Sequence, residues 1–184
     1  TALIYASGEG QTEIVEMLLQ RGANVNATND LGNTPLVGAI RNGNTEIAKM
    51  LIERGADVNI QENSGHTALI YASRRGQTEI ANLLIQRGAD VNIQSPSGFT
   101  ALIYASQKGH TDIARILIDR GADMNAKDKY GNTALTIAIR NGHIDVVRLL
   151  IEKGADIDAR DDDLGSTALV DVCNEDNIEI VRIL

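Results

Sequence analysis

The chain has 184 residues, a formal net charge of −8 and an apolar content of 43%. Aromatic residues make up only 3% and tryptophan is absent, so we expect a core of aliphatic side chains. The acidic balance disfavours nonspecific binding to nucleic acid or to anionic membranes. No apolar run approaches the ~20 residues needed to span a bilayer. The single cysteine, Cys173, excludes an internal disulfide framework and fits a reducing, cytoplasmic compartment.

One heptapeptide recurs through the chain at a nearly constant spacing. Thr-Ala-Leu-Ile-Tyr-Ala-Ser and its variants begin at Thr1, Thr34, Thr67, Thr100, Thr133 and Thr167. The intervals are 33 residues, except the last, which is 34. A period of this length is typical of helical solenoids. We therefore expect a single array over 1–184, with repeats at 1–33, 34–66, 67–99, 100–132, 133–166 and, in part, 167–184.

The repeat that begins at Thr67 contains two short helical patterns. Thr67 suits the N-cap of a helix of about two turns, and Gly76 suits its end. A second helix is expected to start near Thr78, to carry an apolar stripe on one side and to end at Gly88. Residues 89–99 mix turn formers with isolated apolar side chains, which predicts an extended, hairpin-like loop.

Neither helix is long enough to be stable alone, so neighbouring repeats must supply the buried surface. Each repeat opens with Thr-Pro-Leu or Thr-Ala-Leu, and most continue with Gly-His or Gly-Gln, Leu-Leu or Leu-Ile and a form of Gly-Ala-Asp-Val-Asn. These motifs resemble the ankyrin repeat over the whole chain. The resemblance implies an all-α ankyrin-repeat solenoid of helix-turn-helix units joined by hairpin-like loops.

Polar capping repeats are not evident at either end of the array. Leu3, Ala6 and Ile14 are expected to be uncovered at one end, and Ile180 belongs to an apolar face at the other. In solenoids the terminal repeats usually carry a polar outer face. We therefore expect additional repeats or capping units beyond both ends, or another molecule stacked on them.

No group of residues has the pattern of a catalytic or metal site. His110 and His143 are equivalent positions of neighbouring repeats, ~10 Å apart in a helical stack, which is too far to share a zinc ion. A loop-bracing role is expected for both, and His66 is expected to be exposed. The run at 161–163 is read as a solvated acidic patch, because it lacks the spacing of a calcium loop. We expect no enzyme activity, no metal and no cofactor.

The first helices carry a second pattern on the side opposite their buried stripe. In the third repeat this side holds Tyr71, Arg74 and Arg75, and its equivalents in the second to fifth repeats include no acidic residue. Many of the carboxylates fall on the second helices instead. Loop ends add further large side chains. The predicted partner-binding residues are Tyr5, Leu31, Arg41, Tyr71, Arg74, Arg75, Phe99, Tyr104, Lys108, Tyr130 and Arg140.

The resemblance implies that first helices and loop tips line a concave binding surface. Aromatic side chains with cationic neighbours are typical of interface hot spots. We therefore expect a non-catalytic scaffold for protein–protein interaction that binds an extended acidic segment. Repeats ~10 Å apart match three residues of an extended chain at ~3.3 Å each. Carboxylates or phosphates at every third position of the partner would then meet successive cations.

Three alternative roles for these residues are compatible with the sequence. The cations at the ends of the first helices complement the helix dipoles, which is a purely structural role. A nucleotide or short oligonucleotide is a second kind of ligand, with Tyr71 and Tyr104 stacking on bases, although the negative charge and the lack of a phosphate-binding loop disfavour it. The third is a passive spacer that positions other domains.

Overall fold

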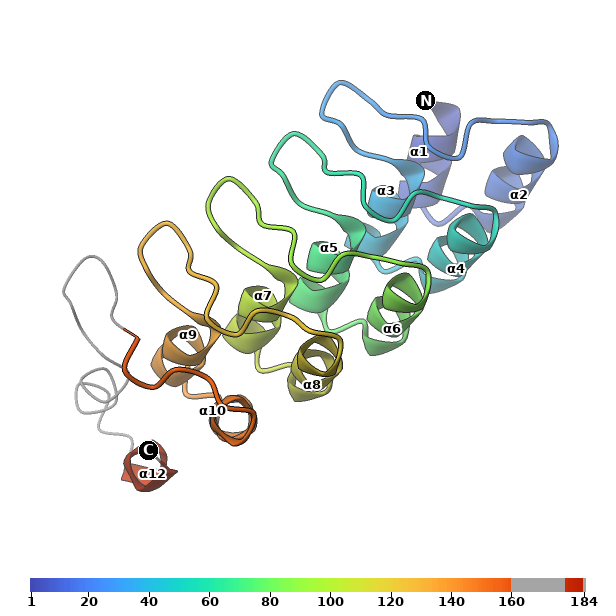
Figure 1. Cartoon of the computed structure of the whole chain (residues 1–184). Helices are drawn as coiled ribbons and strands as arrows, with labels where there is room; N and C mark the ends of the chain where they lie inside the picture. Colours follow the sequence, from blue (N-terminus) through green and yellow to red (C-terminus); the bar gives the residue numbers. More distant parts are fainter. Residues whose placement is uncertain (160–177, 184) are drawn as a thin grey trace. The chain divides into compact units, whose positions relative to one another are not determined.

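The computed structural model describes residues 1–159 and 178–183 of the chain. These residues form helices joined by turns and loops, and none of them lies in a strand (Figure 1). The chain divides into two compact units, Thr1–Asp90 and Val91–Leu184. The all-α helix-turn-helix fold expected from the repeats is confirmed.

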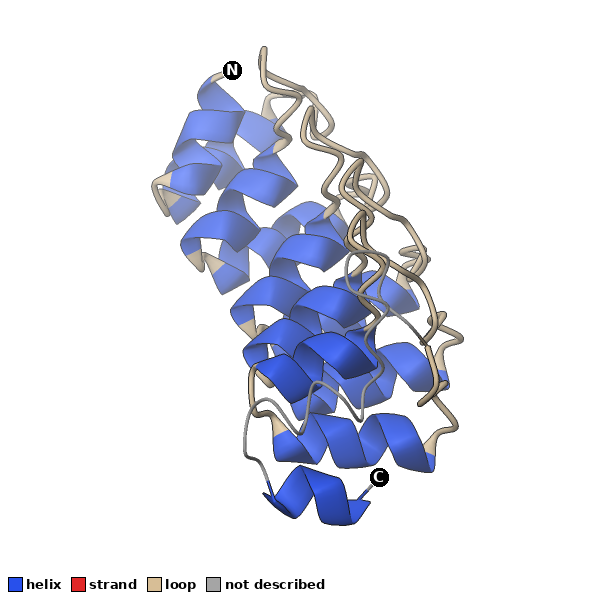
Figure 2. Cartoon of the chain, turned by 90° about the vertical axis from the view of Figure 1, so that its left-hand side faces the viewer, coloured by secondary structure: helices blue, strands red, loops and turns tan. Residues whose placement is uncertain are grey.

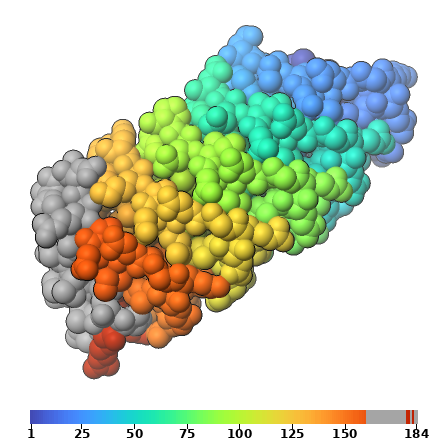
Figure 3. Space-filling model, in the orientation of Figure 1, coloured from blue at the N-terminus to red at the C-terminus, as the bar shows by residue number. Residues whose placement is uncertain are grey.

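The first unit contains three pairs of short helices. The first helices of the pairs, α1, α3 and α5, pack side by side, and α2, α4 and α6 form a neighbouring row (Figure 1). Figure 3 shows the successive repeats of this unit, from blue to green, as adjacent layers. The bounds are α1 (Ala2–Gly8), α2 (Thr12–Gln20), α3 (Pro35–Asn42), α4 (Thr45–Glu53), α5 (Ala68–Arg75) and α6 (Thr78–Gln86).

The second unit repeats this arrangement. Helix α7 packs against α9, α8 packs against α10, and α10 packs against α12. Within each unit the loops lie along one side of the helices, as Figure 2 shows in tan. The bounds are α7 (Ala101–Lys108), α8 (Thr111–Asp119), α9 (Ala134–Arg140), α10 (Ile144–Glu152) and α12 (Ile178–Ile183).

The threonine that opens each of the first five repeats caps the first helix, as predicted. The hydroxyl of Thr67 accepts a hydrogen bond from the backbone N–H of Ile70 at 3.3 Å. Gly76 ends the same helix with a φ of 71°, a left-handed conformation that costs glycine little. Helix α9 adds a capping box, because the Thr136 hydroxyl accepts from the backbone N–H of Thr133 in return. Local sequence therefore sets the limits of these helices.

The core consists of aliphatic side chains, as the composition predicts. Leu36, Leu51, Leu69 and Leu84 are at most 1% exposed in the first unit, between the two rows of helices. Each Å² of apolar surface that is buried contributes about 25 cal/mol to stability. In a repeat array much of that surface is buried against the neighbouring repeats, so each repeat depends on its neighbours for stability. No helix of the described residues is long and apolar enough to cross a membrane.

The expectation that Leu3 and Ala6 would be uncovered is wrong. Both are 2% exposed, because α1 packs closely against α2 and α3. Ile14 is 46% exposed, as expected, whereas its equivalents Ile47 and Ile80 are each 1% exposed beneath the preceding repeat. The uncovered apolar surface of the first repeat therefore lies on α2 rather than on α1.

Polar side chains of one repeat bond to the backbone of the next. The Asn44 amide donates to the carbonyls of Ser7 and Gly8, each at 2.8 Å. In the second unit His143 Nε2 donates to the Gln107 carbonyl at 3.0 Å, which confirms its predicted bracing role. Helices α4, α6 and α10 are thus each tied to the C-terminal part of a first helix in the preceding repeat.

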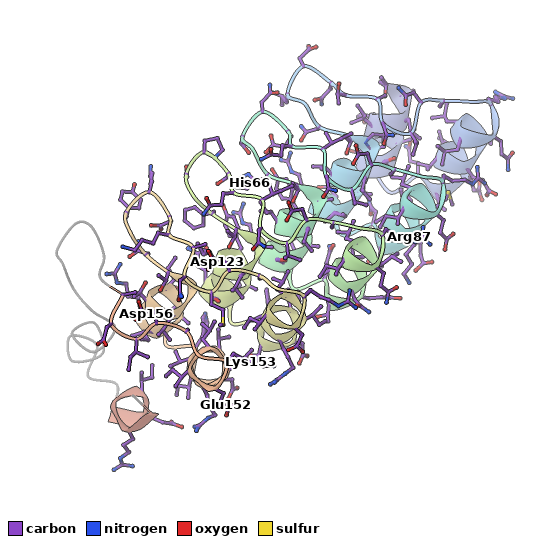
Figure 4. The ribbon with its side chains drawn as sticks, in the orientation of Figure 1. His66, Arg87, Asp123, Glu152, Lys153 and Asp156 are labelled. Carbon is purple, nitrogen blue, oxygen red and sulfur yellow. The ribbon has the colours of Figure 1, made fainter. Side chains whose placement is uncertain are left out.

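A row of asparagines connects the loops of successive repeats. Asn59 Oδ1 accepts from the Asp90 N–H at 2.9 Å, and its Nδ2 donates to the Gly88 carbonyl at 3.0 Å. Asn92 makes the equivalent bond to the N–H of Asp123, labelled in Figure 4, at 2.8 Å. These side chains satisfy backbone groups that the hairpin leaves without a partner, so they stabilise the loops.

Candidate partner-binding surface

The predicted binding residues come from two parts of each repeat. One is the C-terminal turn of the first helix, and the other is the hairpin before it. Each unit carries such a surface, and we call it the front face of that unit. The exposed side chains on the two front faces are Tyr5, Leu31, Arg41, Arg74, Arg75, Lys108, Tyr130 and Arg140, whereas Tyr71, Phe99 and Tyr104 are half-buried.

Tyr71 is held by three side chains of the preceding repeat. Its hydroxyl donates a hydrogen bond to Glu62 Oε1 at 3.2 Å. The guanidinium carbon of Arg41 lies 5.4 Å from the centre of its ring, within cation–π range. The centre of the His66 ring lies 5.4 Å from the centre of the Tyr71 ring. Burial, reinforced by the Glu62 carboxylate, raises the pKa of the Tyr71 phenol, so the tyrosine stays neutral.

Glu62 is the centre of a small polar network in the hairpin before α5. Its carboxylate accepts hydrogen bonds from the backbone N–H and the hydroxyl of Ser64 and from the backbone N–H of His66. Burial alone would raise its pKa, but these bonds, together with that from Tyr71, lower it below the ordinary value of 4.5. Glu62 is therefore a charged hairpin cap at neutral pH.

The expectation that His66 would be exposed is wrong. Its side chain, labelled in Figure 4, is 17% exposed, and its Nδ1 lies 2.6 Å from the Ser64 hydroxyl oxygen. This brings a serine, a histidine and a carboxylate together. Glu62 Oε1 also lies 3.4 Å from His66 Nδ1, so the carboxylate and the serine approach the same ring nitrogen. In a catalytic triad they occupy opposite nitrogens of the imidazole, and here the carboxylate bonds to the serine and to the hairpin backbone as well. The group braces the loop.

Two of the predicted cations also bond to the hairpin. Arg41 Nη1 donates to Asn33 Oδ1 at 3.2 Å, and Arg140 Nη1 donates to Asn132 Oδ1. In both cases the asparagine immediately precedes the threonine that caps the same helix. These arginines thus fix the helix against its hairpin, although both residues are exposed overall.

The second unit contains a second aromatic pair. The Phe99 and Tyr104 rings have centroids 4.9 Å apart and planes inclined by 31°, which is a favourable offset arrangement. Tyr130 is 46% exposed at a hairpin tip, where the Lys129 ammonium lies 4.7 Å from its ring centre. Phe99, predicted as a binding residue, therefore packs against a second predicted residue of its own unit.

The remaining predicted residues are spread over both units. Leu31 and Tyr5 are 62% and 67% exposed in the first unit. Arg74 and Arg75 lie in the last turn of α5, and Lys108 lies in the last turn of α7, in the second unit. The front face of each unit thus presents exposed cations beside a packed aromatic pair.

Charges on the second helices are arranged differently. Lys49 contacts Glu79 of the next repeat at 2.8 Å and Glu46 at 3.2 Å, and these carboxylates raise the pKa of the Lys49 ammonium. In the second unit Lys153, labelled in Figure 4, lies 2.6 Å from Asp119 and lowers the pKa of that carboxyl. Such exposed pairs contribute little to stability, and they partly neutralise the acidic second helices.

The described residues hold no group of three or more His, Cys, Asp or Glu side chains that could bind a metal ion. The acidic run at 161–163 and Cys173 lie outside the described residues. The contacts between the hairpins and the first helices were not predicted from the sequence. Two sequence signals identify them. One is a pair of aromatic residues five positions apart, such as His66 with Tyr71, and the other is an Asn–Arg pair eight positions apart, such as Asn33 with Arg41.

Family models match almost the entire chain. A model described as ankyrin repeats (3 copies) matches residues 3–95, 51–128 and 90–161, and a model described as ankyrin repeats (many copies) matches residues 141–184. No curated protein matches the chain at the significance required.

Proposed function

The chain belongs to the ankyrin repeat family, whose members are generally protein–protein interaction modules, and from this premise we propose that its front face binds an extended acidic segment of a protein partner. One observation carries the proposal. The last turns of the first helices in the second to fifth repeats hold exposed cations and no carboxylate, although the chain as a whole is acidic.

Each unit offers this segment its own contacts. In the first unit Arg41 and Arg74 occupy equivalent positions of successive repeats, and in the second unit Lys108 and Arg140 lie at the ends of neighbouring first helices. Helices packed ~10 Å apart are spaced like every third residue of an extended chain, at ~3.3 Å per residue. Carboxylates at that spacing would each meet one cation.

The packed aromatic pairs support the same function. Tyr71 and Tyr104 are half-buried and are held by neighbouring side chains, so they lose little conformational freedom when a partner covers them. Rigid aromatic surfaces of this kind are common at interface hot spots. A scaffold that binds without catalysing a reaction fits the contacts of the described residues.

Charge reversal tests the proposal. We would measure the binding of a fluorescent peptide with glutamate at every third position and glycine and serine elsewhere, by anisotropy. The substitutions Arg74→Glu with Arg75→Glu in the first unit, and Lys108→Glu in the second, should each weaken binding at least about tenfold, as expected for hot-spot losses of ~1.4 kcal/mol or more.

The matched controls reverse the same number of charges at the ends of second helices. They are Arg21→Glu with Arg54→Glu for the arginine pair, and Arg120→Glu for Lys108→Glu. If the control substitutions weaken binding as much as the front-face substitutions do, only net charge matters and the proposal fails. The same assay with an oligothymidylate addresses the nucleic-acid alternative. Tight binding of that probe, lost steeply as salt rises, would favour the alternative.

A further inference from the structure

The site that holds Tyr71 in the third repeat has an emptied counterpart in the second repeat. Tyr71 contacts Arg41 and Glu62, both of the preceding repeat, and Glu62 lies in the hairpin before α5. One repeat earlier, Gly38 occupies the position equivalent to Tyr71, and Gly8 occupies the position equivalent to Arg41. Both large side chains are therefore replaced by hydrogen atoms at the same place in the fold.

A hollow of about 240 Å³ occupies this place on the front face of the first unit. Gly8 and Gly38 line it from α1 and α3, Tyr5 and Arg41 line it from the same two helices, and Asn29 lines it from the hairpin. The volume is below the ~300 to 1,000 Å³ of a pocket for a drug-sized ligand. It suits a single large side chain.

Close packing does not require glycine at position 38. A β-carbon there would have the Ile4 carbonyl oxygen as its nearest neighbour at 3.5 Å, which is ordinary van der Waals contact, and the backbone of Gly38 is helical. Glycine inside a helix costs ~0.5 to 1 kcal/mol relative to alanine. Glycine at position 38 therefore lowers the stability of α3 slightly, and it leaves the hollow unfilled.

We propose that the hollow between Gly8 and Gly38 receives one tyrosine side chain of the bound partner. The third repeat shows the fit, because Tyr71 occupies the equivalent space with its hydroxyl on the hairpin residue Glu62. In the hairpin before α3 the equivalent residue is Asn29, whose Oδ1 accepts from the backbone N–H groups of Leu31 and Asn33. Its Nδ2 would therefore donate to the tyrosine hydroxyl. The partner ring would lie against Tyr5, which is 67% exposed, in an aromatic contact.

This inference deepens the proposed function, since the tyrosine would be carried by the segment that the front face binds. The two can nevertheless fail separately. The hollow is tested with a single amino-acid derivative that is too small to reach the last turn of α5, so Arg74→Glu with Arg75→Glu should leave its binding unchanged.

The test is a titration of the ¹⁵N-labelled chain with N-acetyl-L-tyrosinamide, followed by amide chemical shifts. We expect saturable shifts at Gly8, Gly38 and Asn29, and none of that pattern with N-acetyl-L-leucinamide. Gly38→Tyr, which fills the hollow with the side chain found in the third repeat, should abolish the shifts. Gly8→Arg is a second filling variant on the opposite wall, in case the first fails to fold.

Several outcomes would overturn the proposal. One is the absence of saturable shifts at these residues. Another is an equal response to the leucine derivative. A third is an unchanged response in a folded Gly38→Tyr or Gly8→Arg variant.

Discussion

The guanidinium of Arg41 lies over the ring of Tyr71, 5.4 Å from its centre, so a cation of one repeat covers the tyrosine of the next. The same arginine bonds to Asn33 at the base of its own hairpin. A charged side chain on the front face thus links two repeats of the first unit. Substitutions around this pair should therefore change stability as well as binding.

Tyr71→Phe should destabilise the chain by about 1.5 to 3 kcal/mol, the usual contribution of a hydrogen bond to a charged group, because it removes the bond to Glu62. The free energy of unfolding in urea measures the effect. Tyr5→Phe is the matched control, since Tyr5 is 67% exposed and its change should stay within about 0.5 kcal/mol. Equal effects of the two substitutions would contradict the assigned contact.

Glu62 should make stability depend on pH. Its pKa is lower in the folded chain than the ordinary value of 4.5, so it contributes stability that is fully present above that value and is lost as pH falls through the folded pKa. The difference in unfolding free energy between wild type and Glu62→Gln should therefore shrink from pH 7 toward pH 3. A difference that stays constant over this range would show that the carboxylate charge is not involved.

Ser73→Ala should leave the chain as stable as before or raise its stability by up to about 1 kcal/mol, because it removes a buried, unpaired hydroxyl and adds a better helix former. The Ser73 hydroxyl is buried and has no hydrogen-bond partner among the described residues. Its equivalent in the second repeat is the apolar Ile40. Thermal unfolding monitored by circular dichroism measures this, and a clear loss of stability would reveal a bond to this hydroxyl.

The loop asparagine Asn59 should contribute to stability through two hydrogen bonds. Asn59→Ala removes both the bond to the Asp90 N–H and the bond to the Gly88 carbonyl, so it should cost about 1 to 3 kcal/mol. Asn59→Asp keeps the acceptor and loses the donor, and it should cost less. Chemical denaturation of the two variants compares them, and an Asp variant as unstable as the Ala variant would assign the effect to the donor alone.

The repeat period and the capping residues are sufficient to predict the helices, because Thr67 and Gly76 act locally on the backbone. The side-chain contacts of the front face depend on two repeats at once. The helical period places Tyr71 away from the core, yet Glu62 and Arg41 hold it from a hairpin and from a neighbouring helix. That period assigns a residue to one side of its own helix, but it says nothing about what the adjacent repeat places there.

The most direct test of the account is a map of where an acidic peptide binds. The ¹⁵N-labelled chain would be titrated with the peptide that carries glutamate at every third position, and amide shifts would be assigned to residues. The account predicts saturable shifts in the last turns of α3, α5, α7 and α9 and in the hairpins before them. Shifts confined to the second helices α4, α6, α8 and α10 would contradict it.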